Sequence, residues 1–199
     1  MRKIIVVEFL TIDGVMQAPG GSKEDASEGF KYGGWMGPYF GTDKVAGKEM
    51  EKQMEKTHGL LLGRKTYDHF AGYWPEHTEP WPQVNKITKY VVSKTLKKSK
   101  WVNTVILRNV SELKKVKNSD GPDLQVYGSG NLVQTLMEHD LVDEFWLKIF
   151  PITLGSGKRL FEKGTKPYSF KLFDSKISSN GIIFAYYKRD GEVKTGSMT

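Results

Sequence analysis

The sequence contains no cysteine, and this absence excludes disulfides, thiolate metal sites and a cysteine nucleophile. The histidines follow no metal-ligand spacing, so we expect no metal site. The apolar run at the N-terminus is interrupted at Glu8, too early for a signal peptide, and no segment is long enough to span a membrane. These absences together favour a reducing compartment, and we expect the protein in the cytoplasm.

Positive charge exceeds negative charge, and the 199 residues carry a formal net charge of +7. Much of the excess lies in two lysine-rich runs, at residues 93–100 and 112–119. Such a balance suits either nucleic acid or a polyanionic small molecule. No nucleic-acid module or aromatic-basic signature accompanies the lysines, so a small polyanion is the favoured ligand.

Apolar runs and amphipathic segments alternate along the first 140 residues. Strands are expected at residues 3–10, 58–63, 89–94, 104–108 and 124–128. Helices are expected at residues 42–57, 64–70, 110–117 and 131–140. Thr42 or Asp43 is the expected N-cap of the first of these helices, and Ser111 that of the third. Three more strand-like segments follow, at residues 143–155, 168–179 and 181–189.

This order of segments predicts the fold class. Repeated βα units give parallel strands, and terminal hairpins add antiparallel ones. We therefore expect an α/β domain with a mixed, mainly parallel sheet and a C-terminal antiparallel hairpin region, with the first strand near the centre. No repeat or linker interrupts the pattern, so residues 1–190 are predicted to form one domain, followed by a polar tail at 191–199.

Three strand ends share one design, in which small or cationic residues follow the strand directly. The segments read "LLLGRKTY", "YVVSKT" and "QVYGSGN". Because ligands of open α/β sheets bind at the carboxyl ends of the strands, all three could line one crevice. The glycines of "GSGN" have two interpretations, a tight structural turn or a phosphate-binding helix N-terminus. In the second, Thr66 or Ser129 would help to hold a pyrophosphate, and Arg64 and Lys94 would meet an additional phosphate.

The same segments, with "LTIDGVMQAP" and "DEFWLKIFPITLGSGKRLF", occur in an order that resembles a known family. The pattern is similar to the dihydrofolate reductase fold. It resembles most closely the C-terminal reductase domain of the riboflavin-biosynthesis deaminase-reductase and its stand-alone relatives. The resemblance covers residues 3–188 and implies a three-layer domain, NADPH as cofactor and hydride transfer as the reaction.

The resemblance also implies which residues bind the cofactor. Residues expected to hold the NADPH phosphates are Gly63, Arg64, Lys65 and Thr66. Residues expected near the adenine ribose and its 2′-phosphate are Ser93 and Lys94. The expected pyrophosphate loop consists of Gly128, Ser129, Gly130, Asn131 and Leu132. The expected wall between nicotinamide and substrate consists of Ile12, Asp13 and Gly14.

Some positions depart from the family pattern. The riboflavin reductase domain usually has a lysine in its first strand, where this chain has Val7 and Glu8, and Tyr127 stands where an acidic residue is usual. Ser129 replaces the second glycine of the pyrophosphate loop. The substrate therefore stays open among 5-amino-6-(5-phosphoribosylamino)uracil, dihydrofolate and another small heterocycle or carbonyl compound.

Asp13 is the candidate catalytic and substrate-binding residue, because the reduction needs a proton as well as a hydride. Its alternative interpretation is an Asp-Gly turn. Glu8 is a second candidate, with a solvated edge carboxylate as its alternative. Trp35 and Trp74 could cover a flat substrate, or they could pack in the core.

Two other function classes remain open beside the reductase. One is a non-catalytic, NADPH-binding regulatory protein on the same fold, and the other is a basic nucleic-acid-binding module.

The strands after residue 143 carry apolar residues at both odd and even positions, which predicts that both of their faces are covered. We therefore expect a homodimer through the C-terminal strands. The alternative cover is the first helix or the glycine-rich segment at residues 19–41 of the same chain.

Overall fold

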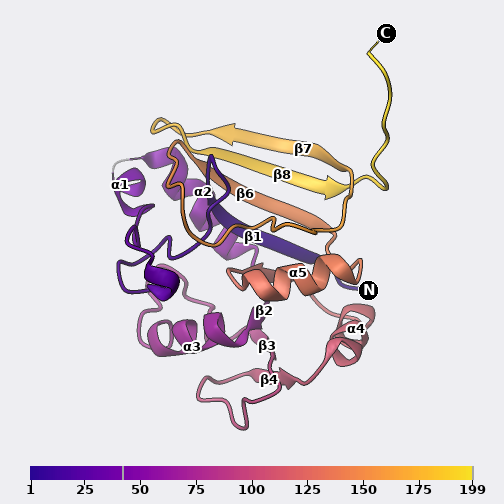
Figure 1. Cartoon of the computed structure of the whole chain (residues 1–199). Coiled ribbons are helices and arrows are strands. Elements are labelled where there is room, and N and C mark those ends of the chain that lie inside the picture. The colour runs from indigo at the N-terminus through magenta and orange to yellow at the C-terminus, as the bar shows by residue number, and fades with distance from the viewer. Residues whose placement is uncertain (42, 199) are drawn as a thin grey trace.

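An eight-stranded sheet runs through the molecule in the order β4-β3-β2-β5-β1-β6-β8-β7 (Figure 1). The computed structural model describes residues 1–41 and 43–198. The strands are β1 Ile4–Thr11, β2 Gly59–Gly63, β3 Thr88–Val92, β4 Thr104–Leu107, β5 Leu124–Tyr127, β6 Glu144–Phe150, β7 Phe170–Ile177 and β8 Ile183–Arg189. Strands β1 to β6 pair in parallel, whereas β8 is antiparallel to both β6 and β7. The predicted mixed, mainly parallel sheet and the central place of β1 are confirmed.

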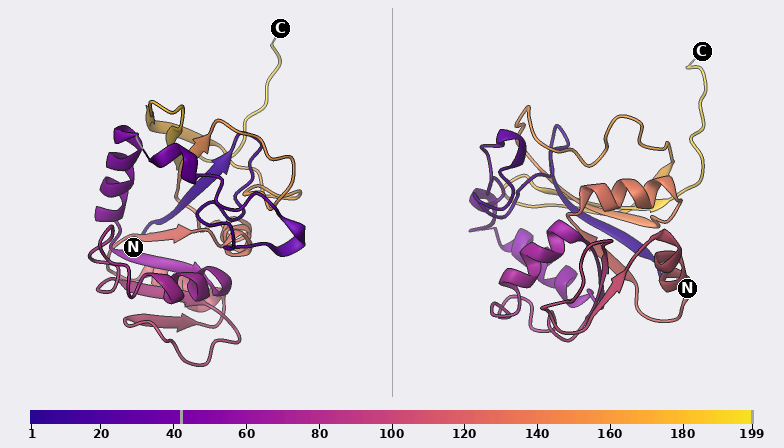
Figure 2. Two further views of the ribbon diagram at one scale, coloured as in Figure 1. Left: turned by 90° about the vertical axis from the view of Figure 1, so that its left-hand side faces the viewer. Right: turned by 60° about the horizontal axis from the view of Figure 1, so that its bottom comes forward.

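Helices cover both faces of this sheet, which gives the expected three layers (Figure 2). The helices are α1 Gly37–Phe40, α2 Lys44–Glu55, α3 Arg64–Tyr73, α4 Val110–Asn118 and α5 Gly130–Glu138, with a short 3₁₀ turn at Ser27–Gly29. Apolar residues of α4 and α5 join one core cluster, and those of α2 and α3 join clusters on the opposite face. In the part of the chain that the structure describes, no helix has both the length and the apolar composition needed to cross a membrane.

Alternation along β1 explains why its sequence is a continuous apolar run. Ile4, Val6 and Leu10 belong to the cluster under α5, whereas Ile5 and Val7 belong to the cluster on the α3 face. A central parallel strand is buried on both faces, so both parities are apolar. Because β1, β2, β3 and β5 pair in parallel, their carboxyl ends lie at one edge of the sheet.

Two helix caps were predicted from sequence, with different outcomes. The Asp43 carboxylate accepts hydrogen bonds from the backbones of Val45 and Ala46 at 3.0 and 2.9 Å, so Asp43 caps α2, and Thr42 lies outside the described residues. The assignment of Ser111 to α4 was wrong. Asn109 is the cap, because its side-chain oxygen accepts the Glu112 N–H at 3.0 Å and Ser111 already lies inside the helix.

The C-terminal strands are covered mainly from within the chain. Trp35, Tyr39 and Phe40 pack around Phe150 of β6, with ring centroids 5.2, 5.4 and 5.8 Å from its ring. The alternative cover, the glycine-rich segment, is thus present on this face. The outer strand β7 differs, because Leu172, Phe173 and Ile177 are exposed, the last by 71%. Within one chain, the uncovered apolar side chains therefore lie on β7 rather than β6, and the homodimer stays a prediction.

Candidate functional site

The β2–α3 and β5–α5 junctions are held together by a single hydroxyl group. The Ser129 Oγ accepts a hydrogen bond from the Gly63 N–H at 2.9 Å and donates to Thr66 Oγ1 at 2.9 Å or to the Tyr127 carbonyl at 3.1 Å. Because β2 and β5 are neighbours in the sheet, the N-termini of α3 and α5 start side by side at its carboxyl edge. The structure therefore brings together the Gly63–Thr66 and Gly128–Leu132 segments that the sequence predicted as one site.

The backbone of the β5–α5 turn explains why its residues are small. Gly128 and Ser129 are both left-handed, with φ of 55° and 62°. A Cβ at Gly128 would lie 3.2 Å from Thr66 Oγ1, so a side chain there would both strain the backbone and crowd α3. A tight turn therefore requires Gly128, and the structural interpretation of "GSGN" is satisfied whether or not a phosphate binds.

The N-termini of α3 and α5 have no side-chain cap. Helices α2 and α4 begin with side-chain caps, whereas neither Gly63 nor Ser129 caps its helix with a side-chain hydrogen bond. The first N–H groups of two helices are thus left without side-chain partners at one edge of the sheet. Such groups attract anions through their dipoles and their free hydrogen-bonding capacity.

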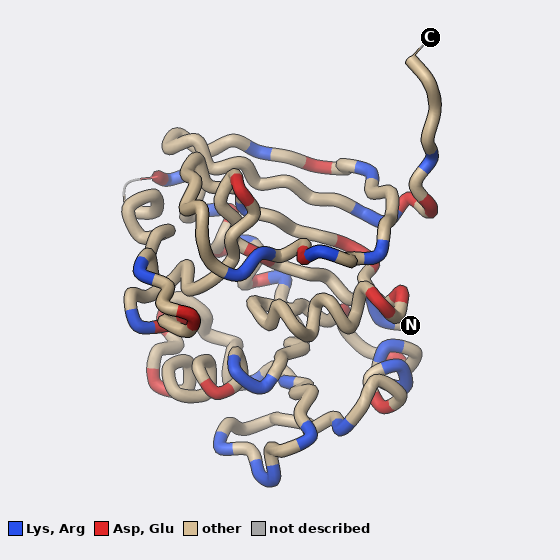
Figure 3. Tube along the Cα trace, viewed as in Figure 1, with Lys and Arg blue, Asp and Glu red and all other residues tan. Residues whose placement is uncertain are grey.

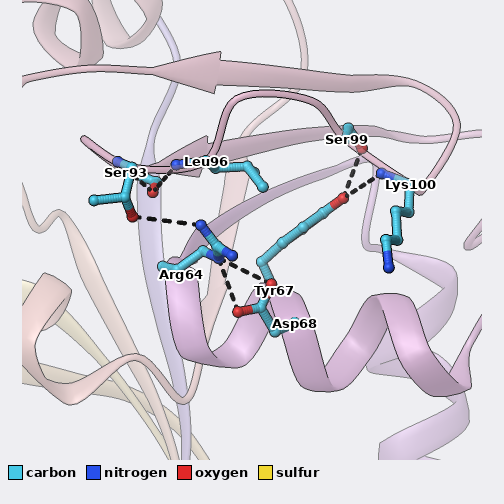
Figure 4. Close-up of polar contacts among 8 residues, drawn as sticks. Arg64, Tyr67, Asp68, Ser93, Leu96, Ser99 and Lys100 are labelled. Carbon is cyan, nitrogen blue, oxygen red and sulfur yellow. Dashed lines mark hydrogen bonds and ion pairs between the residues drawn. The ribbon is translucent and has the colours of Figure 1, made fainter.

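The third junction, after β3, adds positive charge beside the N-terminus of α3 (Figure 4). Arg64 Nε donates to both carboxylate oxygens of Asp68, at 2.9 and 2.8 Å, and its Nη1 lies 3.4 Å from Thr95 Oγ1. The Ser93 hydroxyl is engaged inside its own turn, where it accepts from the Leu96 N–H at 3.0 Å. Lys94 and Lys65 are exposed, and Figure 3 shows further cationic residues along the loop between β3 and β4. The exposed lysines, rather than Ser93, are the groups free to meet a phosphate, and Arg64 lies beside them in an ion pair with Asp68.

The end of β1 forms the remaining part of the site. Ile12 is 64% exposed, although its N–H donates to the Ile152 carbonyl at 2.8 Å, and Gly14 has a φ of 79°. The Met16 sulfur lies 3.4 Å from the place that a Cβ of Gly130 would take, so this loop packs against the start of α5. The predicted wall at residues 12–14 therefore lies beside the predicted pyrophosphate turn, with the apolar side chain of Ile12 facing solvent.

Asp13 is fixed by hydrogen bonds that suit a structural turn. Its carboxylate accepts from the Thr11 hydroxyl at 2.5 Å and from the backbones of Leu154 and Gly155 at 3.2 and 2.9 Å. The Thr11 hydroxyl, followed by the backbone N–H groups, holds the pKa of Asp13 below its usual value. An ionised carboxylate with these partners has no proton to donate, which favours the Asp-Gly turn interpretation.

The two candidate tryptophans lie in different surroundings. Trp35 is buried, and its indole N–H donates to the Gln17 carbonyl at 2.8 Å, so it packs in the core rather than facing a ligand. Trp74 is half-buried and meets Trp81 edge-to-face at a centroid distance of 5.2 Å. Of the two, Trp74 alone keeps a surface that a ligand could contact.

Glu8 is buried, so its interpretation as a solvated edge carboxylate was wrong. Its side chain is 2% exposed, and alternation along β1 places it on the α5 face with Val6 and Leu10. Its Oε1 has no hydrogen-bond partner among the described residues. Burial raises the pKa of Glu8 well above its usual range, which favours the neutral form of the group.

A row of polar groups between α2 and the sheet was not anticipated from the sequence. Helix α2 and the residues after it present Glu49, Gln53 and Thr57 to polar partners on three strands, β5, β6 and β8. The partners are Tyr186 for Glu49 (3.0 Å), Tyr127 for Gln53 (2.8 Å), Gln125 for Thr57 (2.9 Å) and Lys148, whose Nζ donates to Gln53 Oε1. We call these seven residues the polar seam. The sequence signals were a lysine inside the apolar run "EFWLKIF" and polar residues spaced four apart.

The sheet order, the helices on both faces and the paired strand-end turns define a dihydrofolate reductase-like α/β fold. The chain belongs to the RibD C-terminal domain family, which it matches over residues 2–184. The predicted fold class and family resemblance are thus confirmed, and membership supports a reductase-type function.

Curated relatives and solved structures agree with this assignment. The chain is similar to two uncharacterised proteins of Bacillus subtilis (strain 168). YyaP is 33% identical over 142 residues, 66% of this chain and 74% of YyaP, and YwjB is 24% identical over 189 residues, 94% and 98% of the two chains. A putative riboflavin biosynthesis protein from Shewanella sp. PV-4 has a TM-score of 0.61 and 21% identity, covering 94% of this chain and 99% of that one. Dihydrofolate reductase from Enterococcus faecalis, complexed with NADP(H) and RAB-propyl, has a TM-score of 0.59 and 13% identity, covering 94% and 96%.

Proposed function

We propose that the protein is an NADPH-dependent reductase that transfers a hydride to a small heterocyclic or carbonyl compound. The observation that carries the proposal is the pair of uncapped helix N-termini joined by Ser129, with Arg64 and two exposed lysines beside them. Two adjacent anion sites followed by a cationic one match the charge distribution of a dinucleotide with an additional phosphate.

Each part of the site has a role in this proposal. The backbones of Gly128–Leu132 and Gly63–Thr66 would hold the pyrophosphate, and Arg64 and Lys94 would meet the 2′-phosphate. Gly128 and Gly130 keep side chains away from the turn, so the residues present fit a phosphate that approaches the backbone. Ile12 to Gly14 would border the nicotinamide, whose reduced form supplies the hydride when it is bound. The remaining task of the protein is to hold the acceptor there and to supply a proton.

The proposal also concerns the identity of the hydride acceptor. Family membership and the Shewanella structure favour a reaction like that of 5-amino-6-(5-phosphoribosylamino)uracil reductase, in riboflavin biosynthesis and in the cytoplasm. The fold shared with dihydrofolate reductase makes dihydrofolate the next candidate. The polar seam would suit either heterocycle, because both rings present amide-like donors and acceptors.

One observation favours a second candidate function. The ionised, hydrogen-bonded Asp13 offers no proton at the position where the sequence predicted a donor. A protein that binds NADPH without turning over an acceptor, with a regulatory role, would need none. Consumption of NADPH, followed by its absorbance in a screen of oxidised heterocycles and carbonyl compounds, separates the two. Turnover of any acceptor supports the reductase, and tight NADPH binding without turnover supports the regulatory protein.

A further inference from the structure

Lys148 differs from the other buried lysines because, in the described part of the chain, its one hydrogen-bond partner is a neutral side-chain oxygen. Lys89 donates to two backbone carbonyls at 3.1 and 3.0 Å and lies over the Trp101 ring, and Lys117 pairs with the Asp143 carboxylate. Lys148 is fully buried, yet among the described residues its Nζ donates only to the side-chain oxygen of Gln53. An ammonium group has three donors, so Lys148 keeps bonding capacity that the fold does not use.

The position of Lys148 relates this unused capacity to the candidate site. In the β1–β6 register Lys148 is paired with Phe9, three residues before Ile12, and its Nζ lies 5.4 Å from the centre of the Phe9 ring. Gln53 bonds Lys148 and also Tyr127, the residue directly before Gly128. The ammonium group therefore lies on the α2 face of the sheet beside β1, the strand that leads to the predicted nicotinamide wall. Gln53 links it to β5, the strand that leads to the predicted pyrophosphate turn.

We propose that Lys148 is the proton donor of the reduction. The acceptor is a planar heterocycle or carbonyl compound that enters the polar seam, and its C=O oxygen or C=N nitrogen replaces the Gln53 amide at Lys148 Nζ. This inference rests on the proposed reductase function and names a residue for the step that Asp13 does not serve.

The step balances in atoms and electrons. The acceptor carbon receives a hydride, with its two electrons, from reduced NADPH, and the π electrons of the C=O or C=N bond move to the oxygen or nitrogen. That atom then takes a proton from the Lys148 ammonium, which becomes an amine and later regains a proton from water. The products are the reduced acceptor and NADP⁺.

The electrostatics of the seam suit a proton donor at neutral pH. Burial lowers the pKa of the Lys148 ammonium to about 7. The titratable groups that face it are Glu49 on α2, Tyr127 on β5, Tyr186 on β8 and, across the sheet, Glu8 on β1. The Glu49 carboxylate, which also accepts from Lys176 on β7, favours the charged form of Lys148, and Glu8 does so only when it is ionised. Neither carboxyl group bonds Lys148. A donor with a pKa near the working pH is the most effective general acid.

The inference is tested with Lys148→Met and Lys148→Arg, and Lys89→Met serves as the matched control. Lys89 is equally buried and its pKa is also lowered by burial, to about 8, but it lies at the far side of the sheet in the β3 strand. Both Lys148 variants should keep the NADPH dissociation constant and lose about 100-fold or more in single-turnover NADPH oxidation, because general acid catalysis contributes that much. Arginine keeps the charge but holds its proton, so Lys148→Arg keeps the test valid if the methionine variant does not fold. Lys89→Met should react like the wild type.

A second readout does not depend on turnover. The Lys148 side-chain NMR resonance, assigned by its loss in Lys148→Met, should titrate near pH 7 in the NADP⁺ complex. It should shift when 7,8-dihydrofolate or 5-amino-6-(5-phosphoribosylamino)uracil is added to that complex. Activity of the wild type should fall as the pH rises through 7, because the protonated form is required.

Three results would overturn the assignment: both Lys148 variants within threefold of the wild type, a resonance that titrates at the ordinary lysine value, or no shift with either compound. Failure of the wild type to bind NADPH would instead reject the proposed function, and the inference with it.

Discussion

Replacement of Ser129 by alanine tests the link between the two strand-end turns. The hydroxyl accepts the Gly63 N–H and donates one further hydrogen bond, to Thr66 or to the Tyr127 carbonyl. Each lost hydrogen bond removes about 0.5–1.5 kcal/mol of net stabilisation, so Ser129→Ala should lower the free energy of unfolding by about 1–3 kcal/mol. In a chain of this size, that corresponds to a fall in Tm of about 2–4 °C for each kcal/mol.

The loss should also reach the proposed cofactor site, because the same hydroxyl bonds both the β2–α3 and the β5–α5 junction. We expect NADPH to bind Ser129→Ala about tenfold more weakly than the wild type, the equivalent of one lost hydrogen bond. Urea unfolding and isothermal titration calorimetry measure the two effects. Ser119→Ala is the control, because its exposed hydroxyl donates to the Val116 carbonyl at 2.8 Å far from this edge. If Ser129→Ala and Ser119→Ala match in both stability and NADPH affinity, the linking role of Ser129 is refuted.

Three further predictions follow from the turn, the buried acid and the outer strand. Gly128→Val should abolish NADPH binding in a folded protein, since a Cβ would meet Thr66 Oγ1 at 3.2 Å, and unchanged affinity would leave "GSGN" as only a turn. Glu8→Gln should gain stability relative to the wild type as the pH rises from 4 to 7, because the unfolded wild type ionises above its ordinary pKa of 4.5 while burial raises the pKa of the folded acid well above that value; a constant difference in urea unfolding across this range would refute the burial argument. Light scattering should give about twice 22.6 kDa for the wild type and a smaller mass for Ile177→Lys, whereas 22.6 kDa at every micromolar concentration would reject the homodimer through β7.

The helices and strands, and the grouping of the strand-end turns at one edge of the sheet, could be predicted from the sequence because both depend on local patterns. The apolar run of β1 and the amphipathic pattern of α5 are legible within about ten residues each. The strand-end turns could be grouped because parallel strands send their carboxyl ends to one edge. The Asn109 cap of α4 was missed because Asn109 and Ser111 both suit an N-cap, and the choice depends on where the helix begins.

The polar seam and the burial of Glu8 and Trp35 could not be predicted in the same way. Gln53 and Lys148 are 95 residues apart in the chain, and nothing local indicates that they will be neighbours. Glu8 looks like a solvated carboxylate until the fold places it on the α5 face of β1, where its side chain is 2% exposed. Trp35 lies in a glycine-rich segment, and only the fold shows that this segment packs over Phe150.

The most direct test of the account is the pair of dissociation constants for NADPH and NADH, measured by calorimetry at one salt concentration. We predict that NADPH binds about tenfold or more tightly than NADH, because the 2′-phosphate gains at least one charge-assisted hydrogen bond from Arg64 or Lys94. The double substitution Arg64→Gln with Lys94→Gln should remove most of that difference. Lys188→Gln should leave it unchanged, because Lys188 is on β8, away from the carboxyl ends of β2, β3 and β5. Equal dissociation constants for NADPH and NADH in the wild type would contradict the assignment of this edge as an NADPH site.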